Sequence, residues 1–160
     1  MNKIITPEIA IKTSEVLRGK GKHIILAGGC FDILHIGHIE FLKQAKKYGD
    51  YLFILLESDE SCAKKGKNRP INMLYDRAKI LSAIGLVDYI IPIPEFDDQG
   101  YIDLIKQLKP DTIAITKNDP FKDRKEEQAK LINAKVVEVI NHLSNKSTTQ
   151  LLKLLSENNI

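Results

Sequence analysis

Short apolar runs alternate along this chain with longer segments in which apolar residues recur every three or four positions. Runs of this kind are typical of strands buried on both faces of a sheet, and the three- or four-residue spacing is typical of helices that bury one face. The apolar runs predict strands at 23–27, 51–56, 88–93, 112–115 and 135–140. The periodic segments predict helices at 7–18, 37–48, 74–84, 101–108, 125–132 and 148–157.

Local signals support several of these boundaries. Thr6 is a good N-cap, and Pro7 suits the first position of the helix that follows it. Gly85 is a typical stop for the helix predicted at 74–84. The segment 57–70 is polar and rich in lysine, which predicts a mobile loop.

The alternation of strands and helices predicts an α/β fold, namely a Rossmann-like doubly wound sheet of five parallel strands. The 160 residues fit one domain, with an N-terminal helix in 1–19 and the Rossmann-like core in 20–160. Ligands of such sheets bind beyond the carboxyl ends of the strands, where the strand order reverses. The loops at that edge are 28–38, 57–70, 94–98, 116–121 and 141–149.

The loop after the first strand, GGCFDILHIGH, carries the clearest candidate chemistry. Gly28 and Gly29 place no side chain there, so a phosphate can approach the backbone amides. His35 and His38 are three residues apart at a predicted helix start, which puts both imidazoles on one face near the positive end of the helix dipole. A single histidine there would more often be structural. A pair flanking Gly37 favours a site for triphosphate oxygens.

Charge and cysteine content narrow the function classes further. The chain has 24 Lys and Arg against 21 Asp and Glu, and a net charge of +3 is too small to indicate nucleic-acid binding. Its two cysteines, Cys30 and Cys62, indicate no metal motif or disulfide framework, so we expect two reduced thiols in a cytoplasmic protein. No signal-peptide pattern or membrane-spanning run is apparent, so we expect no membrane partner.

Three segments of the chain resemble a known family. GGCFDILHIGH resembles the HxGH signature of the cytidylyltransferase-like nucleotidyltransferases. KNRPINMLYDRAKILSAIGLVDYI (67–90) is similar to a segment of the bacterial heptose 1-phosphate adenylyltransferases, and NKSTTQLLKLL resembles the family's S-T-T helix start. The resemblance spans about 20–155. It implies a Rossmann-like fold and attack of a phosphorylated acceptor on the α-phosphorus of a nucleoside triphosphate, with a divalent cation, most simply Mg²⁺, bound with the triphosphate.

The resemblance also implies roles for individual residues. It makes His35, His38 and Lys65 the catalytic groups, Lys65 bridging the phosphates of both substrates. It assigns nucleotide binding to Gly29, Cys30, Phe31, Asp32, Gly37, Lys67, Arg77, Asp119, Ser147, Thr148 and Thr149. Several alternatives stay open. Lys64 or Lys67 could replace Lys65, Arg77 could form an ion pair instead of a phosphate contact, and Asp32 is more simply structural.

Two departures from the family pattern bear on the substrates. Thr116–Pro120 (TKNDP) stands where heptose enzymes carry a K-G-G-D-Y-like run. His142 or Lys146 stands where glycerol-3-phosphate cytidylyltransferases carry an arginine. We therefore expect an adenylyltransferase for a sugar 1-phosphate. The alternatives are a cytidylyltransferase for glycerol 3-phosphate or another alcohol phosphate, an FMN adenylyltransferase, and a nucleotide-binding regulator without activity. The resemblance leaves a homodimer open.

Overall fold

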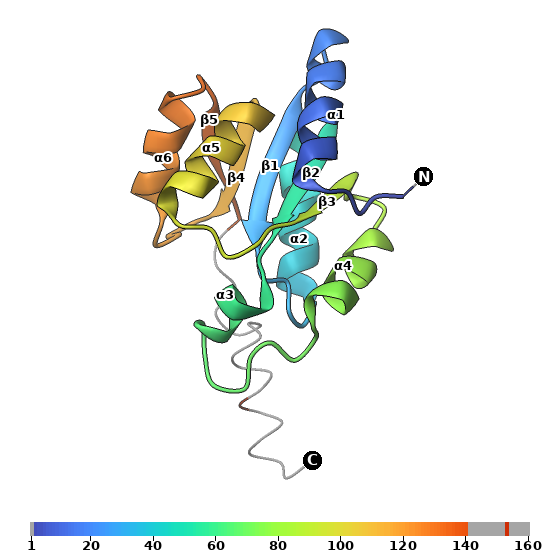
Figure 1. The fold of residues 1–160 in the computed structure, drawn as a ribbon, viewed down its shortest axis with the longest axis vertical. Helices are drawn as coiled ribbons and strands as arrows, with labels where there is room; N and C mark the ends of the chain where they lie inside the picture. Colours follow the sequence, from blue (N-terminus) through green and yellow to red (C-terminus); the bar gives the residue numbers. More distant parts are fainter. Residues whose placement is uncertain (1, 141–152, 154–160) are drawn as a thin grey trace.

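The computed structural model describes residues 2–140 and Lys153, and within them it has one parallel five-stranded sheet with strand order β3-β2-β1-β4-β5 (Figure 1). The strands are β1 (Ile24–Gly29), β2 (Tyr51–Leu56), β3 (Tyr89–Pro92), β4 (Thr112–Thr116) and β5 (Lys135–Ile140). The predicted fold class is confirmed, and each predicted strand is present with small shifts at its ends.

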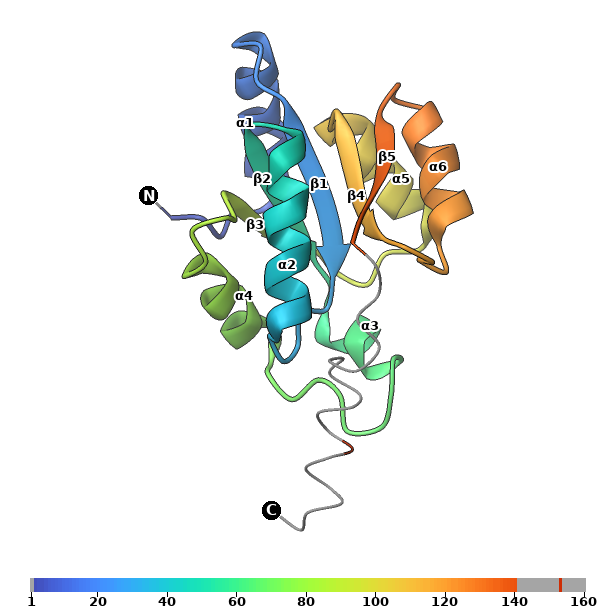
Figure 2. The same ribbon diagram turned by 180° about the vertical axis from the view of Figure 1, so that it is seen from behind.

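Helices cover both faces of this sheet. They are α1 (Pro7–Gly19), α2 (Ile36–Ala45), α3 (Asp59–Ala63), α4 (Leu74–Ser82), α5 (Asp98–Leu108) and α6 (Lys122–Lys130), with a 3₁₀ turn η1 (Lys46–Tyr48) after α2. Figures 1 and 2 show α1, α5 and α6 on one face, and α2 and α4 on the other. Among the described residues, none of these helices combines the length and apolar character needed to cross a membrane.

The central strands are buried on both faces because their side chains alternate between two apolar clusters. Ile25 and Ala27 of β1 pack with residues of α2 and α4, whereas Ile24 and Leu26 pack with residues of α1 and α5. This double burial explains why β1 and β2 appear in the sequence as continuous apolar runs and not as alternating ones.

The segment 57–70 differs from its prediction as a mobile loop. Residues 59–63 form α3, whose N-cap Ser58 accepts a hydrogen bond from the Ser61 amide. The five residues DESCA are too few and too polar to show helical periodicity, so the pattern could not reveal the helix. The predicted helix at 148–157 lies outside the described residues, apart from Lys153.

The strand order reverses at β1, and this reversal opens the sheet where a ligand would bind. The β1–β2 ladder runs the whole length of β1, from Ile24 to Gly29. The β1–β4 ladder covers only Ile25 and Leu26 of β1. Beyond Leu26, β1 and β4 therefore separate towards their carboxyl ends, and the space between them is where sequence analysis placed the site.

Candidate active site

A cavity of about 290 Å³ lies between the diverging ends of β1 and β4. Its walls come from the loop after β1, the first turn of α2, the 57–70 segment, and β4 with the loop that follows it. The lining residues include nine of the predicted site residues: Gly29, Cys30, Phe31, Asp32, His35, Gly37, His38, Lys65 and Asp119. We call this space the first cavity.

His35 and His38 lie together at the amino end of α2. His35 is the N-cap residue and His38 lies in the first turn, and their ring centroids are 3.9 Å apart. The ring of Phe31 lies 5.2 Å from that of His38, and Phe31 adopts a left-handed backbone conformation with φ of 47°. Such a conformation is uncommon outside glycine and is found often at binding loops. The imidazoles and the positive end of the α2 dipole therefore face one cavity, which suits an anion.

The protonation state of His38 follows from its surroundings. Burial lowers the pKa of His38 from 6.5 to about 4, with smaller contributions from the positive charges of His35 and Arg69. No partner satisfies its buried Nδ1 atom within the described residues. His38 is therefore neutral at pH 7, and one of its ring nitrogens carries an N–H that can donate to a phosphate oxygen.

This lowered pKa predicts a pH-dependent stability. The unfolded chain binds the His38 proton below pH 6.5 and the folded chain only below about 4, so folding stability is complete above pH 6.5 and is lost as the pH falls towards 4. Between pH 7.5 and 4.5 we expect the wild type to lose about 2 kcal/mol more than His38→Ala in urea unfolding. Equal losses would contradict the buried neutral state.

Asp32 joins the loop after β1 to the segment that leads into α4. Its carboxylate accepts hydrogen bonds from the amides of Ile71 (2.9 Å) and Asn72 (2.8 Å), and the Asn72 side chain donates to the Asp32 carbonyl at 2.7 Å. The side chain is buried. Asp32 thus holds the loop after β1 in place, which is the structural alternative to nucleotide binding for this residue.

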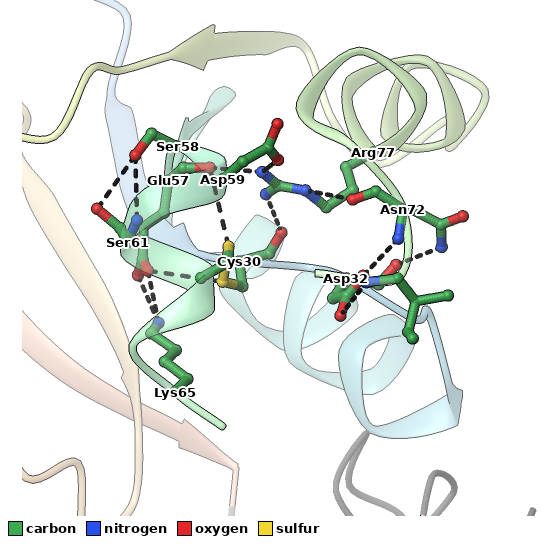
Figure 3. The surroundings of a disulfide bond; sticks show 11 residues. Cys30, Asp32, Glu57, Ser58, Asp59, Ser61, Lys65, Asn72 and Arg77 are labelled. Atoms are coloured by element: carbon green, nitrogen blue, oxygen red, sulfur yellow. Dashed lines mark hydrogen bonds and ion pairs between the residues drawn. A yellow bond between two sulfur atoms is a disulfide. The ribbon is translucent and has the colours of Figure 1, made fainter. Parts of the chain in front are cut away.

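Arg77 of α4 is buried, with only 1% of its surface exposed, and does not line the first cavity. Its guanidinium donates to the carbonyls of Cys30 (2.6 Å), Glu57 (2.9 Å) and Asn72 (3.0 Å), and to the Asp59 carboxylate at 2.8 Å. Figure 3 shows these hydrogen bonds between Arg77 and the loops after β1 and β2. The structure therefore favours the ion-pair alternative for Arg77. Its hydrogen bonds connect the loop that carries the histidines with the loop that carries Lys65.

Cys30 and Cys62 form a disulfide, so the expectation of two reduced thiols is wrong in this structure (Figure 3). Their Cα atoms are 5.8 Å apart, within the usual range for such bonds. The pairing follows from the parallel register, because Gly29 of β1 lies beside Leu56 of β2 and the chains leave the sheet as neighbours. Residues 32 positions apart in sequence therefore meet, which spacing alone does not reveal.

Among the three candidate lysines, Lys65 lines the first cavity and also an adjoining second cavity, whereas Lys64 lines only the second. Its Nζ lies 2.6 Å from the Glu57 carboxylate, and its side chain is 42% exposed. Lys64 forms an ion pair with Glu95. Lys67 is exposed and lines neither cavity. The geometry thus favours Lys65 as the bridging lysine over Lys64 and Lys67.

A second cavity of about 510 Å³ adjoins the first. The two share wall residues, which are Gly28, Gly29, Lys65 and Lys125. The rest of the second cavity is lined by the end of β2 and the segment after it, by the start of α5 with the loop before it, and by α6. These elements contribute Glu57, Lys64, Glu95, Asp97, Tyr101 and Arg124, among others. Burial raises the pKa of the Tyr101 hydroxyl to about 12, with help from the negative charge of Glu57. Tyr101 is therefore a neutral hydrogen-bond donor at pH 7.

Sequence analysis missed some of the residues that line the cavities. Lys125 lines both cavities and its Nζ lies 2.8 Å from the Asp119 carboxylate, while Arg69 and Thr116 line the first. Lys125 lies on α6, whose polar sequence carries no motif, so only the fold could identify it. Arg69 lies in the lysine-rich segment 57–70, and its positive charge there is a sequence signal for a phosphate site. Ser147, Thr148 and Thr149 lie outside the described residues.

Comparison with known proteins agrees with this fold and site. The model of the cytidylyltransferase-like family matches residues 26–159. This chain belongs to the cytidylyltransferase-like family of nucleotidyltransferases.

Two curated relatives of this chain share one description. The chain is 38% identical over 145 residues to the bifunctional protein HldE of Campylobacter concisus, covering 89% of this chain and 29% of that protein. It is 39% identical over 145 residues to the protein of the same name from Campylobacter fetus, covering 89% and 30%. The chain thus spans less than a third of the length of these relatives.

Two solved structures resemble the fold. A lipopolysaccharide core biosynthesis protein of Thermoplasma volcanium superposes with a TM-score of 0.66 at 32% identity, over 76% of this chain and 99% of that one. The pantoate-beta-alanine ligase of Francisella tularensis superposes with a TM-score of 0.64 at 15% identity, over 100% of this chain and 79% of that one. The second similarity concerns the fold alone.

Proposed function

We propose that this chain transfers the adenylyl group of ATP to a sugar 1-phosphate of the heptose type and releases pyrophosphate. The observation that carries the proposal is the meeting of two cavities at Lys65, one with a histidine pair at a helix amino end and the other with carboxylates and a partly buried tyrosine. The similarity to the HldE proteins and the segment 67–90 support the choice of a sugar 1-phosphate.

The first cavity would hold the triphosphate. Neutral His38, together with His35, would donate to α- and β-phosphate oxygens at the amino end of α2, where the dipole favours negative charge. Gly29 offers its backbone without a side chain at the point of closest approach. Charge that develops on the α-phosphate during attack would thus meet donors that are already in position.

The second cavity would hold the acceptor. Its phosphate would lie beside Lys65 and Lys125 at the shared wall, within reach of the α-phosphorus. Carboxylates such as Glu95 and Asp97 can accept hydrogen bonds from ring hydroxyls, and the neutral Tyr101 hydroxyl can donate one. The acceptor phosphate is already a nucleophile at neutral pH, so the mechanism needs no general base from the protein.

Mg²⁺ would come with the triphosphate. It would supply charge neutralisation for the triphosphate and would need few protein ligands. Asp32 and Asp119, the carboxylates of the first cavity, are already bound by backbone amides or by Lys125. Among the described residues, the grouping with metal-ligand geometry is Cys30, Glu57 and Cys62, whose sulfurs form the disulfide and do not suit a hard cation.

The proposal is tested by following pyrophosphate release with Mg²⁺ and each of ATP, CTP, GTP and UTP. The acceptors are heptose 1-phosphate, glycerol 3-phosphate, phosphocholine and FMN. We expect release with ATP and the sugar 1-phosphate. Release with CTP and glycerol 3-phosphate would instead support the cytidylyl alternative, and nucleotide binding without release would support a regulator.

Lys65 and Lys67 provide a matched pair of variants for the bridging role. Lys65→Ala removes the cation at the shared wall, so we expect kcat/KM to fall about tenfold or more. Lys67→Ala removes an exposed cation outside both cavities. Because solvent screens such a charge, kcat/KM should change less than about twofold. A larger loss for Lys67→Ala than for Lys65→Ala would reverse the assignment.

A further inference from the structure

We propose that Cys30 and Cys62 form a redox modification site that reacts with small thiols and controls the position of Lys65. Cys30 is the first residue after β1 in the loop that leads to His35, and Cys62 lies in α3, three residues before Lys65. The disulfide therefore joins, by one covalent bond, the two segments that meet at the first cavity (Figure 3).

The link from Cys62 to Lys65 is direct. The Lys65 amide donates to the Cys62 carbonyl at 3.1 Å, so the Lys65 backbone follows any movement of Cys62. A helix of five residues is not stable without tertiary contacts. Opening the disulfide removes one of the contacts that hold α3 against the loop after β1. The backbone of the 57–70 segment then becomes more mobile at Lys65.

Glu57 completes a contiguous group at this position. Its carboxylate lies 2.6 Å from Lys65 Nζ, and 3.7 Å from Cys30 Sγ. The ammonium group of Lys65 is thus held against an acid that itself lies beside the disulfide. A shift of either cysteine therefore disturbs the ion pair between Glu57 and Lys65, which sets the direction of the Lys65 side chain.

Reagents reach the disulfide from the first cavity. Cys30 keeps 8% of its surface exposed and lines that cavity, whereas Cys62 is fully buried and lines neither cavity. A small thiolate attacks Cys30 Sγ, the S–S bond breaks, and Cys62 leaves as a thiolate that takes a proton. A second thiol then releases Cys30 as a thiol. Overall, two small thiols are oxidised to a disulfide and the protein disulfide is reduced to two thiols. A bound nucleotide shields this route.

The primary test is hydrogen exchange measured by mass spectrometry on the full chain. The protein is prepared oxidised with oxidised glutathione and reduced with dithiothreitol, and free thiols are counted in both. We expect amides in 57–70 to exchange about tenfold faster after reduction, and amides in α1 to stay unchanged. Equal exchange in both states, or two free thiols after oxidation, would overturn the proposal.

Two further measurements connect the site to the nucleotide and to catalysis. ATP at ten times its Kd should slow reduction about tenfold, since only the free protein exposes Cys30. An unchanged reduction rate would contradict access through the first cavity. Reduction should lower kcat/KM about tenfold through the loosened Lys65. Cys62→Ser should behave as the reduced protein, with or without dithiothreitol, and a response of this variant to the reductant would count against the site.

The ATP protection and activity measurements rest on the proposed function, but hydrogen exchange does not. A redox-dependent change of exchange in 57–70, together with no pyrophosphate release for any substrate pair, would refute the proposed reaction and leave the modification site standing. Release that is insensitive to reduction, with unchanged exchange, would refute the site and leave the reaction standing.

Discussion

His38→Ala is expected to lower kcat about 10²-fold or more while the fold survives. The variant removes a neutral N–H donor at the amino end of α2, where charge develops on the α-phosphate. The loss should fall mainly on kcat, because a donor that strengthens its bond in the transition state contributes little to ground-state binding. His35→Ala should show a loss of the same order. The measurement is pyrophosphate release with the best substrate pair.

His23→Ala is the matched control for the histidine pair. His23 is mostly exposed and lies just before β1, at the opposite end of the strand from the loop that carries His35 and His38. Its removal should leave kcat within twofold of the wild type, as is usual for surface changes remote from a site. Near-normal turnover by His38→Ala, with circular dichroism unchanged, would refute the catalytic assignment.

Arg77→Ala is expected to lower the free energy of unfolding by at least about 3 kcal/mol. The variant leaves the buried carbonyls of Cys30 and Glu57 without their charged donor, and leaves Asp59 without its cation. Urea unfolding at pH 7.5 measures this loss. Arg77→Lys keeps the charge but cannot span four acceptors, so its stability should lie between those of Arg77→Ala and the wild type.

Lys79→Ala is the control for Arg77, because Lys79 lies on the same helix and is exposed. We expect it to change the unfolding free energy by less than about 0.5 kcal/mol. If Arg77→Ala unfolded like this control, Arg77 would not connect the two loops. Its assignment would then return to the phosphate contact that the family resemblance implies.

Sequence patterning predicted the sheet well because β1 and β2 are buried on both faces, which makes their apolar runs continuous. The position of the loop after β1 at a cavity was also predictable, because its glycines and histidines follow a strand directly, and the carboxyl edge of a parallel sheet is where ligands bind. These features are local, and each is encoded within about a dozen consecutive residues.

The features that the sequence could not reveal depend on register and packing. The Cys30–Cys62 bond depends on the strand register that places Gly29 beside Leu56, and the amino-acid sequence alone does not specify this register. Arg77 could not be assigned because a phosphate-binding arginine and a buried one look alike until α4 is packed against the strand ends. Lys125 comes from a helix without apolar periodicity and reaches the site only in the fold.

The central claim, attack on the α-phosphorus, is tested most directly by the fate of a label in ATP. ATP carrying ³²P at the α-position is incubated with the protein, Mg²⁺ and heptose 1-phosphate, and a parallel sample carries the label at the γ-position. We predict that the α-label enters the sugar product and the γ-label appears in pyrophosphate. Transfer of the γ-label to the sugar would make the protein a phosphotransferase and contradict the account.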